Sequence, residues 1–240
     1  MSASPDPRLG RYEFDSSLLG NRRSLWVQTP RPGHRPPGLL LFLDGEHYLR
    51  DLGAVDVVQE LRAAGAIPDL LSVYVSHIDY PTRWRESFCN LDFPRALADE
   101  LLPWLRAEFD IAKEAPAVLV GLSLTGLAAA HAGLQRPGAF EAVACQSGSF
   151  WWEDGAFIHE VGQARASDVT FHLSVGSQET DEDVDHGDGL LQRESQLTAN
   201  RRLRDSLRER GFACTYREFD GGHDAASFRR DLPDCLRSLG

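Results

Sequence analysis

The sequence predicts an α/β fold with a mostly parallel central sheet and helices on both faces. Short apolar runs alternate with segments of helical periodicity along most of the chain. The run 39–43 is continuously apolar, which is typical of a parallel strand covered on both faces. The 240-residue chain has no repeat and no long linker, so we expect a single domain over residues 1–240.

The first 38 residues are predicted to form a strand pair followed by a connector. Apolar stretches at 11–14 and 25–28 flank Gly20 and Asn21, which indicates two strands joined by a turn. The segment 30–38 is rich in Pro and Gly and leads into the first parallel strand.

From residue 39 onward, strands and helices are expected to alternate. The expected strands are 39–43, 70–75, 117–120, 142–144, 170–174 and 214–218. The expected helices are 55–64, 94–109, 124–134, 194–210 and one after Ala225. The segments 150–168 and 179–189 break the alternation after strands. Ligands of open α/β sheets bind beyond the carboxyl ends of the strands, so we expect both segments to be substrate loops.

The composition excludes several kinds of partner. A formal net charge of -11 argues against nucleic acid, because phosphate binding needs clustered Lys and Arg. The N-terminus lacks the pattern of a secretion signal, and the chain has no long apolar run, which predicts a cytoplasmic protein without membrane contact. The four cysteines have no metal-ligand spacing, so no metal and no cofactor are expected. The oligomeric state is left open.

The segment 118–130 has the pattern of a nucleophile elbow. An apolar strand leads into Gly121-Leu122-Ser123, and a helical segment follows. In such a strained turn the serine hydroxyl stands clear of the sheet. The pattern G-x-S-x-G would place glycine at 125, where this chain has Thr125. The elbow predicts an α/β-hydrolase fold with Ser123 as nucleophile; the alternative is a serine that caps a core helix.

A serine nucleophile needs a base, and His223 has the best setting for that role. It lies in a glycine-rich loop, Asp220 to Asp224, after the last expected strand. The order Ser, acid, His in these hydrolases places the base there. His131, two helical turns past Ser123, and His172, within a strand, are expected to be structural.

The third member should be a carboxylate after the strand 171–175. Glu179 is the acid closest to the end of that strand, and the neighbouring Asp181 is the alternative. The dense acidic stretch 181–188 is otherwise typical of a solvated loop.

An oxyanion needs two preorganised donors. One is expected to be the backbone N–H of Leu124, directly after the nucleophile. The other is expected from the turn after 39–43, as the N–H of Gly45 or Glu46, because glycine lets the backbone approach a ligand. Alternatively, Gly45 only terminates the strand.

Long and unusual motifs extend from residue 43 to residue 225. They are Leu43-Asp44-Gly45-Glu46, Arg83-Trp84-Arg85-Glu86 with Cys89-Asn90-Leu91-Asp92-Phe93, Glu100-Leu101-Leu102-Pro103, Gln146 to Trp152, and Asp220 to Ala225. With them the chain resembles the enterochelin (enterobactin) esterase family, cytoplasmic α/β hydrolases of trilactone siderophores. The resemblance implies that Ser123 attacks a lactone carbonyl of a catecholate siderophore and that His223 relays the proton. Iron would arrive only as part of the substrate.

The resemblance also makes Arg83 a candidate for holding an anionic ligand. A guanidinium supplies charge and stacks on catechol rings, and Arg85 and Asn90 lie in the same segment. The alternative for both arginines is a surface ion pair with Glu86 or Asp79.

Trp151 and Trp152 are candidates for the wall of the pocket, with core packing as the alternative.

Three departures from the family keep other functions open. Thr125 replaces the family's glycine, the acidic stretch would repel an anionic ferric siderophore, and the chain starts without the N-terminal domain of full-length enterochelin esterases. A carboxylesterase acting on a feruloyl, aryl or thiol ester would use the same residues. A ligand-binding relative without catalysis is a further alternative.

Overall fold

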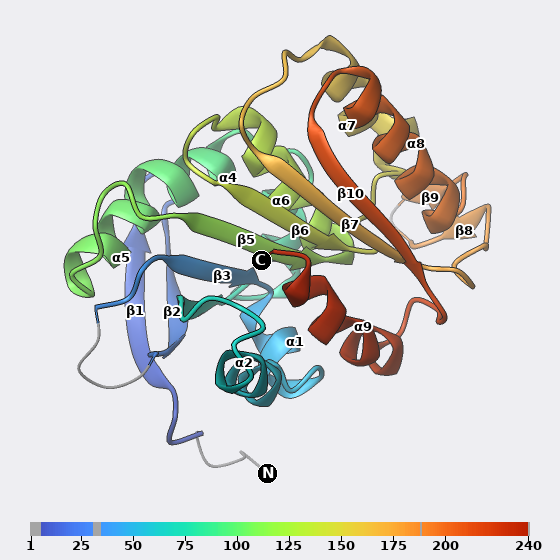
Figure 1. Ribbon diagram of the computed structural model, residues 1–240. Coiled ribbons are helices and arrows are strands. Elements are labelled where there is room, and N and C mark those ends of the chain that lie inside the picture. Colours follow the sequence, from blue (N-terminus) through green and yellow to red (C-terminus); the bar gives the residue numbers. More distant parts are fainter. Residues whose placement is uncertain (1–5, 31–34, 188, 240) are drawn as a thin grey trace.

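Eight strands form one central sheet in the order β1-β2-β4-β3-β5-β6-β7-β10 (Figure 1). The computed structural model describes residues 6–30, 35–187 and 189–239. The strands are β1 Gly10–Ser16, β2 Asn21–Gln28, β3 Leu39–Leu43, β4 Leu71–Val75, β5 Ala117–Leu122, β6 Ala142–Gln146, β7 Thr170–Gly176 and β10 Ala213–Phe219. The pairs β1–β2 and β2–β4 are antiparallel, and every other pair in the sheet is parallel. This confirms the mostly parallel sheet and its N-terminal strand pair.

Helices cover both faces of the sheet (Figure 1). One face carries α1 Gly45–Arg50, α2 Ala54–Ala63 and α9 Ala225–Arg237. The other carries α4 Asp92–Arg95, the π-helical turn η1 Ala96–Leu101, α5 Leu102–Glu108, α6 Ser123–Gln135, α7 Trp152–Gln163 and α8 Gln196–Glu209. The short helix α3 Tyr80–Ser87 lies against α4 and α6.

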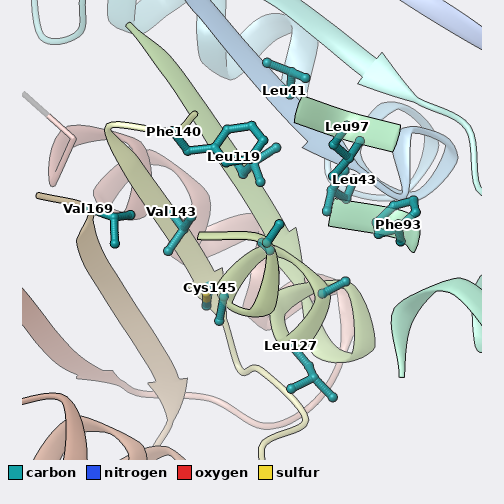
Figure 2. Packing of buried hydrophobic residues seen from close by; sticks show 14 of the residues in the cluster. Leu41, Leu43, Phe93, Leu97, Leu119, Leu127, Phe140, Val143, Cys145 and Val169 are labelled. Atoms are coloured by element: carbon teal, nitrogen blue, oxygen red, sulfur yellow. The ribbon is translucent and has the colours of Figure 1, made fainter. Parts of the chain in front are cut away.

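Alternating side chains of β3 divide the core into two clusters. Leu39, Leu41 and Leu43 belong to the cluster under α4 to α8, whereas Leu40 and Phe42 belong to the cluster under α1, α2 and α9. Successive side chains of a strand point to opposite faces of its sheet, so a strand covered on both faces must be apolar throughout. Figure 2 shows part of the first cluster, where Leu41, Leu119 and Val143 of neighbouring strands meet the helices.

Two expected loops contain regular structure, which corrects the prediction for them. Within 150–168 lies the helix α7, which is kinked because Glu153, Asp154 and Gly155 have left-handed backbone angles. The kink interrupts the helical spacing of apolar residues. Without that regular spacing, the sequence pattern does not predict a helix here. The segment 179–189 contains β8 Val184–Asp185, which pairs with β9 Leu191–Gln192 in a two-stranded ribbon.

Other expectations differ in detail from the structure. The helix expected at 94–109 is a continuous helical segment whose middle widens into the π-helical turn η1, and α1 and α3 were not expected. The connector 30–38 and the acidic stretch 181–188 lie partly outside the described residues. No helix in the described ranges is both long enough and apolar enough to cross a membrane.

Candidate active site

Ser123 lies at a sharp turn between β5 and α6. β5 ends at Leu122, the helix begins at Ser123, and the serine has a φ of 52°, in the left-handed region that a non-glycine residue adopts only under strain. A Cβ atom at Gly121 would lie 2.1 Å from the carbonyl oxygen of Thr125. Only glycine therefore fits at 121, and the turn has the geometry of a nucleophile elbow.

Thr125 fits into the elbow although the motif calls for glycine there. Its side chain is buried, and its hydroxyl accepts the backbone N–H of Leu122 at 3.2 Å. A close approach that favours glycine occurs one residue later, because a Cβ at Gly126 would lie 3.0 Å from the Cα of Gly148. The departure from G-x-S-x-G is thus accommodated without distorting the turn.

Ser123, His223 and Glu179 form one chain of hydrogen bonds. The Oγ of Ser123 lies 2.9 Å from Nε2 of His223, and Nδ1 of His223 lies 2.6 Å from Oε2 of Glu179. A carboxylate only accepts, so Nδ1 carries the proton and Nε2 of the neutral ring is left to accept the serine hydroxyl. This arrangement can remove a proton from Ser123.

The loop after β10 and the start of α9 place His223. Asp224 caps α9 by accepting the N–H of Ser227 at 2.9 Å, and Ser227 Oγ accepts the N–H of Gly222 at 3.2 Å. The imidazole packs edge-on against Phe228, with ring centroids 5.1 Å apart. His223 is therefore held by its own loop as well as by Glu179.

Glu179 is buried and both of its carboxylate oxygens are hydrogen-bonded. While Oε2 faces His223, Oε1 accepts the N–H of Gly176 at 2.8 Å and the hydroxyl of Ser147 at 2.5 Å. A buried carboxylate is tolerated when its oxygens are paired in this way. The contribution of Ser147 was not expected; its signal was a small polar residue directly after β6.

The turn after β3 lies beside the elbow. β3 pairs with β5 in the sheet, and Thr125 Oγ1 of the elbow lies 3.1 Å from Oδ2 of Asp44 in the turn. A Cβ at Gly45 would lie 2.7 Å from the backbone of Tyr74, so this position also needs glycine. The N–H groups of Gly45, Glu46 and Leu124 all lie in the first turn of a helix, where no helical acceptor is available.

A cavity of 330 Å³ opens beside Ser123. Besides the three hydrogen-bonded residues, its wall includes Trp151, Asp181 and His186. The Trp151 and His186 rings are stacked, with centroids 5.0 Å apart and planes 8° apart. Trp151 therefore lies where the sequence predicted a pocket wall, and Asp181 brings acidic charge to the same cavity.

A second cavity of 670 Å³ shares His186 with the first. Its other walls are largely aromatic and include Tyr80, Trp84 and Phe88. Trp152 does not line either cavity among the described residues, but it stacks on Phe88 with centroids 4.9 Å apart. Trp152 therefore packs against one of the aromatic residues that line the second cavity.

The two predicted arginines have intramolecular partners. Arg83 forms an ion pair with Asp44, with Nη2 of the guanidinium 2.6 Å from Oδ2 of the carboxylate and Nε within 2.9 Å of both carboxylate oxygens. Arg85 donates to the hydroxyl of Thr82 at 3.3 Å. Within the described part of the chain, neither arginine lines the cavity beside Ser123.

Glu86 and Asp79, the acids expected as alternative ion-pair partners of these arginines, have other partners in the structure. Glu86 pairs with Arg23 at 2.9 Å in the interior, and Asp79 caps α3 by accepting the N–H of Thr82 at 2.8 Å. Asn90 is half-buried and follows the turn at 88–89, where its side chain donates to the carbonyl of Arg85 at 3.1 Å. Its predicted substrate role has no support from this position.

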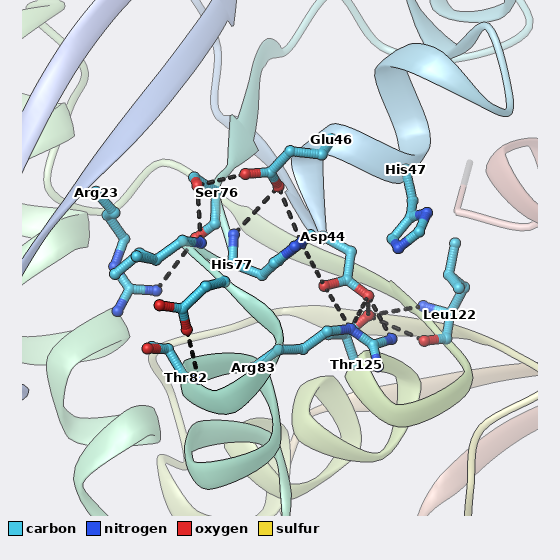
Figure 3. Close-up of polar contacts among 12 residues, drawn as sticks. Arg23, Asp44, Glu46, His47, Ser76, His77, Thr82, Arg83, Leu122 and Thr125 are labelled. Carbon is cyan, nitrogen blue, oxygen red and sulfur yellow. Dashed lines mark hydrogen bonds and ion pairs between the residues drawn. The ribbon is translucent and has the colours of Figure 1, made fainter.

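Asp44, in the turn after β3, lies in a network of charged side chains (Figure 3). His77 Nδ1 lies 3.4 Å from Asp44 and 3.1 Å from Glu46. These two carboxylates, Asp44 first, raise the pKa of His77 to about 9. Burial alone would raise the pKa of Asp44, but His77 and Arg83 outweigh it and lower that pKa. Asp44 is therefore a carboxylate held between two cations.

The other two histidines considered from the sequence lie elsewhere. His131 is buried 3.7 Å from Glu160, and burial lowers its pKa to about 4. His172 lies on β7, where Nδ1 is 2.9 Å from the hydroxyl of Thr215.

Comparison with known proteins places the chain among esterases. A family model described as "Putative esterase" matches residues 16–239. The Iron(III) enterobactin esterase of Dickeya dadantii is 30% identical over 97% of this chain and 55% of its own length. The enterobactin esterase FES of Shigella flexneri, crystallised in the presence of enterobactin, is 28% identical with a TM-score of 0.84, over 98% of this chain and 59% of that one. A ferulic acid esterase at 18% identity, with a TM-score of 0.75 over 96% of both chains, shares the fold.

The match to the curated relatives is extensive for this chain but partial for them. The chain spans about half the length of the relatives it matches, since 55% of the Dickeya protein is covered. The family model, by contrast, covers most of the chain. The chain therefore belongs to the esterase family that this model describes, with an α/β-hydrolase fold.

Proposed function

We propose that the chain is a serine esterase that hydrolyses an ester or lactone through an acyl-enzyme. The observation that carries the proposal is the hydrogen-bonded chain from Ser123 through His223 to Glu179. Nε2 of His223 takes the hydroxyl proton as Ser123 Oγ attacks the carbonyl carbon, and then returns it to the leaving alcohol. Water repeats the two steps to release the acid. Glu179 holds the ring and stabilises the imidazolium.

The tetrahedral intermediate needs donors for its oxyanion. We assign the N–H of Leu124 and that of Gly45, with Glu46 as the neighbouring alternative. Support comes from the adjacency of β3 and β5 and from the 3.1 Å contact between Thr125 and Asp44, which brings the two turns together.

The substrate class that we propose is a catecholate trilactone siderophore of the enterobactin type. Support comes from relatives named enterobactin esterases and from the aromatic cavity around Trp84 and Phe88, which adjoins the cavity beside Ser123 at His186. Catechol rings can stack on aromatic walls of this kind. Cleavage of the ring ester would weaken the hold on bound iron.

An uncharged aryl or feruloyl ester is a second candidate. The observation that favours it is the acidic Asp181 in the cavity wall, together with the pairing of Arg83 to Asp44. A ferric tris-catecholate is anionic and would meet repulsion from Asp181, and none of the described residues lining this cavity is an arginine that could offset it.

The proposal is tested with Ser123→Ala and Ser206→Ala. Ser206 lies on α8 and donates to a backbone carbonyl of α7, so it controls for loss of a hydroxyl elsewhere. Hydrolysis of iron-free and ferric enterobactin-like trilactones and of a neutral aryl ester is followed for both. We expect no hydrolysis by Ser123→Ala and wild-type rates for Ser206→Ala.

A fluorophosphonate identifies the nucleophile directly. Peptide mass spectrometry should find the adduct on Ser123 and not on Ser149, whose Oγ is 3.4 Å away. Full hydrolysis by Ser123→Ala would show that another group is the nucleophile. A wild-type protein that neither hydrolyses these esters nor reacts with the probe would be a ligand-binding relative.

A further inference from the structure

Thr125 joins the two turns that meet at the proposed oxyanion hole. It lies two residues after Ser123, and its hydroxyl contacts Asp44 Oδ2 at 3.1 Å, the N–H of Leu122 at 3.2 Å and the carbonyl of Leu122 at 3.0 Å. A hydroxyl has one proton to donate, and donation to a carboxylate is stronger than donation to a neutral carbonyl. Thr125 therefore accepts from Leu122 and donates to Asp44.

Asp44 determines the direction of the turn after β3. Its φ of 64° and ψ of 47° are left-handed, a conformation that costs free energy for a residue with a side chain. Gly45 follows directly and approaches β4 so closely that no side chain fits there. A shift of Asp44 therefore moves the N–H of Gly45.

Residues outside the elbow hold the same carboxylate of Asp44. Arg83, from α3, approaches Asp44 with two nitrogens, and His77 lies 3.4 Å from it. The Asp44 side chain is 0% exposed, so no solvent contact competes with these groups. Thr125 is the contact from the side of the elbow, which Figure 3 shows between Asp44 and Leu122.

We propose that Thr125 is a positioning residue that couples the nucleophile elbow to the oxyanion turn. By binding Asp44, its hydroxyl sets the distance between the N–H of Leu124 and the N–H of Gly45. A glycine at 125 has no side chain with which to make this contact. The inference rests on the proposed function, since it concerns stabilisation of the oxyanion of an ester-cleavage intermediate.

The test compares Thr125→Val, Thr125→Ser and Thr215→Val on a neutral aryl ester. Valine keeps the shape but loses the hydroxyl, serine keeps the hydroxyl, and Thr215 controls for loss of an exposed threonine on β10. Loss of a complete oxyanion donor costs ~100- to 1000-fold in kcat, so a displaced donor should cost about tenfold. We expect that loss in kcat for Thr125→Val, with KM unchanged, rescue by Thr125→Ser, and wild-type kinetics for Thr215→Val.

Thr125→Ala provides a second variant in case valine prevents folding, and thermal melts identify folded protein. Wild-type kcat in folded Thr125→Val or Thr125→Ala would overturn the inference while leaving the proposed function intact. Failure of Thr125→Ser to restore kcat would also overturn it. A wild-type protein that cleaves no ester would overturn the proposed function and this inference together.

Discussion

Oε2 of Glu179 lies 2.6 Å from Nδ1 of His223, and no other acid of the loop after β7 makes a described contact with that ring. Glu179→Gln keeps the shape of the side chain but offers an amide that can donate to the ring and stabilise the wrong tautomer. If Glu179 is the acid of the proposed triad, we expect kcat to fall by ~10³- to 10⁴-fold, as in serine hydrolase triads that lose their acid. Steady-state kinetics on an aryl ester measures this.

Asp181→Asn is the matched control for that substitution. Asp181 lines the same cavity but has no contact with His223 in the described hydrogen bonds, so its neutral-ester kcat should stay within a fewfold of wild type. If Asp181→Asn lost as much activity as Glu179→Gln, the acid would be misassigned.

The charge of the cavity predicts a substrate preference. Asp181 should disfavour anionic esters, so kcat/KM for a carboxylate-bearing aryl ester should lie below that for its neutral analogue. Asp181→Asn should reduce this difference in kcat/KM between the two esters. Added salt should reduce it in the wild type, because salt screens the interaction between exposed charges. An anionic ester that is preferred at low salt would contradict this.

The buried pair of Arg23 and Glu86 predicts a large effect on stability. Their side chains are only 3% and 4% exposed, and Asn21 also donates to Glu86 at 2.6 Å. Glu86→Ala leaves a buried guanidinium without its partner, which should lower the free energy of unfolding by about 3–5 kcal/mol. Urea denaturation measures the change.

The exposed pair of Arg22 and Asp15 offers the comparison. Their side chains are 65% and 67% exposed, so Asp15→Ala should change the free energy of unfolding far less than Glu86→Ala does. Similar losses for the buried and the exposed pair would be inconsistent with the burial argument.

His77 predicts a pH dependence of stability. Its pKa in the folded protein is raised to about 9 from an ordinary value of 6.5. Its contribution is fully present below the ordinary pKa, where both states hold the proton. It falls between the two values because unfolding then releases a proton, and it is absent once pH has risen through 9.

Comparison with His77→Gln isolates this contribution. The difference in unfolding free energy between wild type and variant should be largest near pH 6 and should shrink toward pH 9.5. Urea titrations at several pH values measure it. A difference that grows with pH would have the wrong sign for a cation held by Asp44 and Glu46.

Local patterns in the sequence predicted much of the fold and the three residues that form the hydrogen-bonded chain of the candidate site. β3 was recognisable because a strand covered on both faces must be apolar throughout, and the elbow because Gly121, Ser123 and the flanking strand and helix are contiguous. Glu179 lies just after β7, as the order Ser, acid, His predicts, and its carboxylate contacts His223. Each of these signals lies within a few residues.

Long-range pairings escaped prediction. Arg83 was expected to meet substrate, but it pairs with Asp44, 39 residues away in sequence, and nothing in either segment alone specifies the other. The same holds for Ser147, which donates to Glu179 from a neighbouring strand end. The kinked helix α7 was missed because left-handed residues disturb its periodicity. Such features depend on the assembled sheet.

Because β10 lies at the edge of the sheet, we expect activity to be lost at a lower denaturant concentration than the fold. Among the described residues, β10 is the last strand in the sheet order and pairs only with β7, whereas β5, which leads directly into Ser123, lies between β3 and β6. An edge strand is held by one ladder of hydrogen bonds and opens at lower free energy than an interior strand. Mild denaturant should therefore release β10 and disturb the loop after it, which holds His223, while Ser123 stays in place, giving an inactive but largely native protein. Hydrogen exchange should show β10 exchanging before β5.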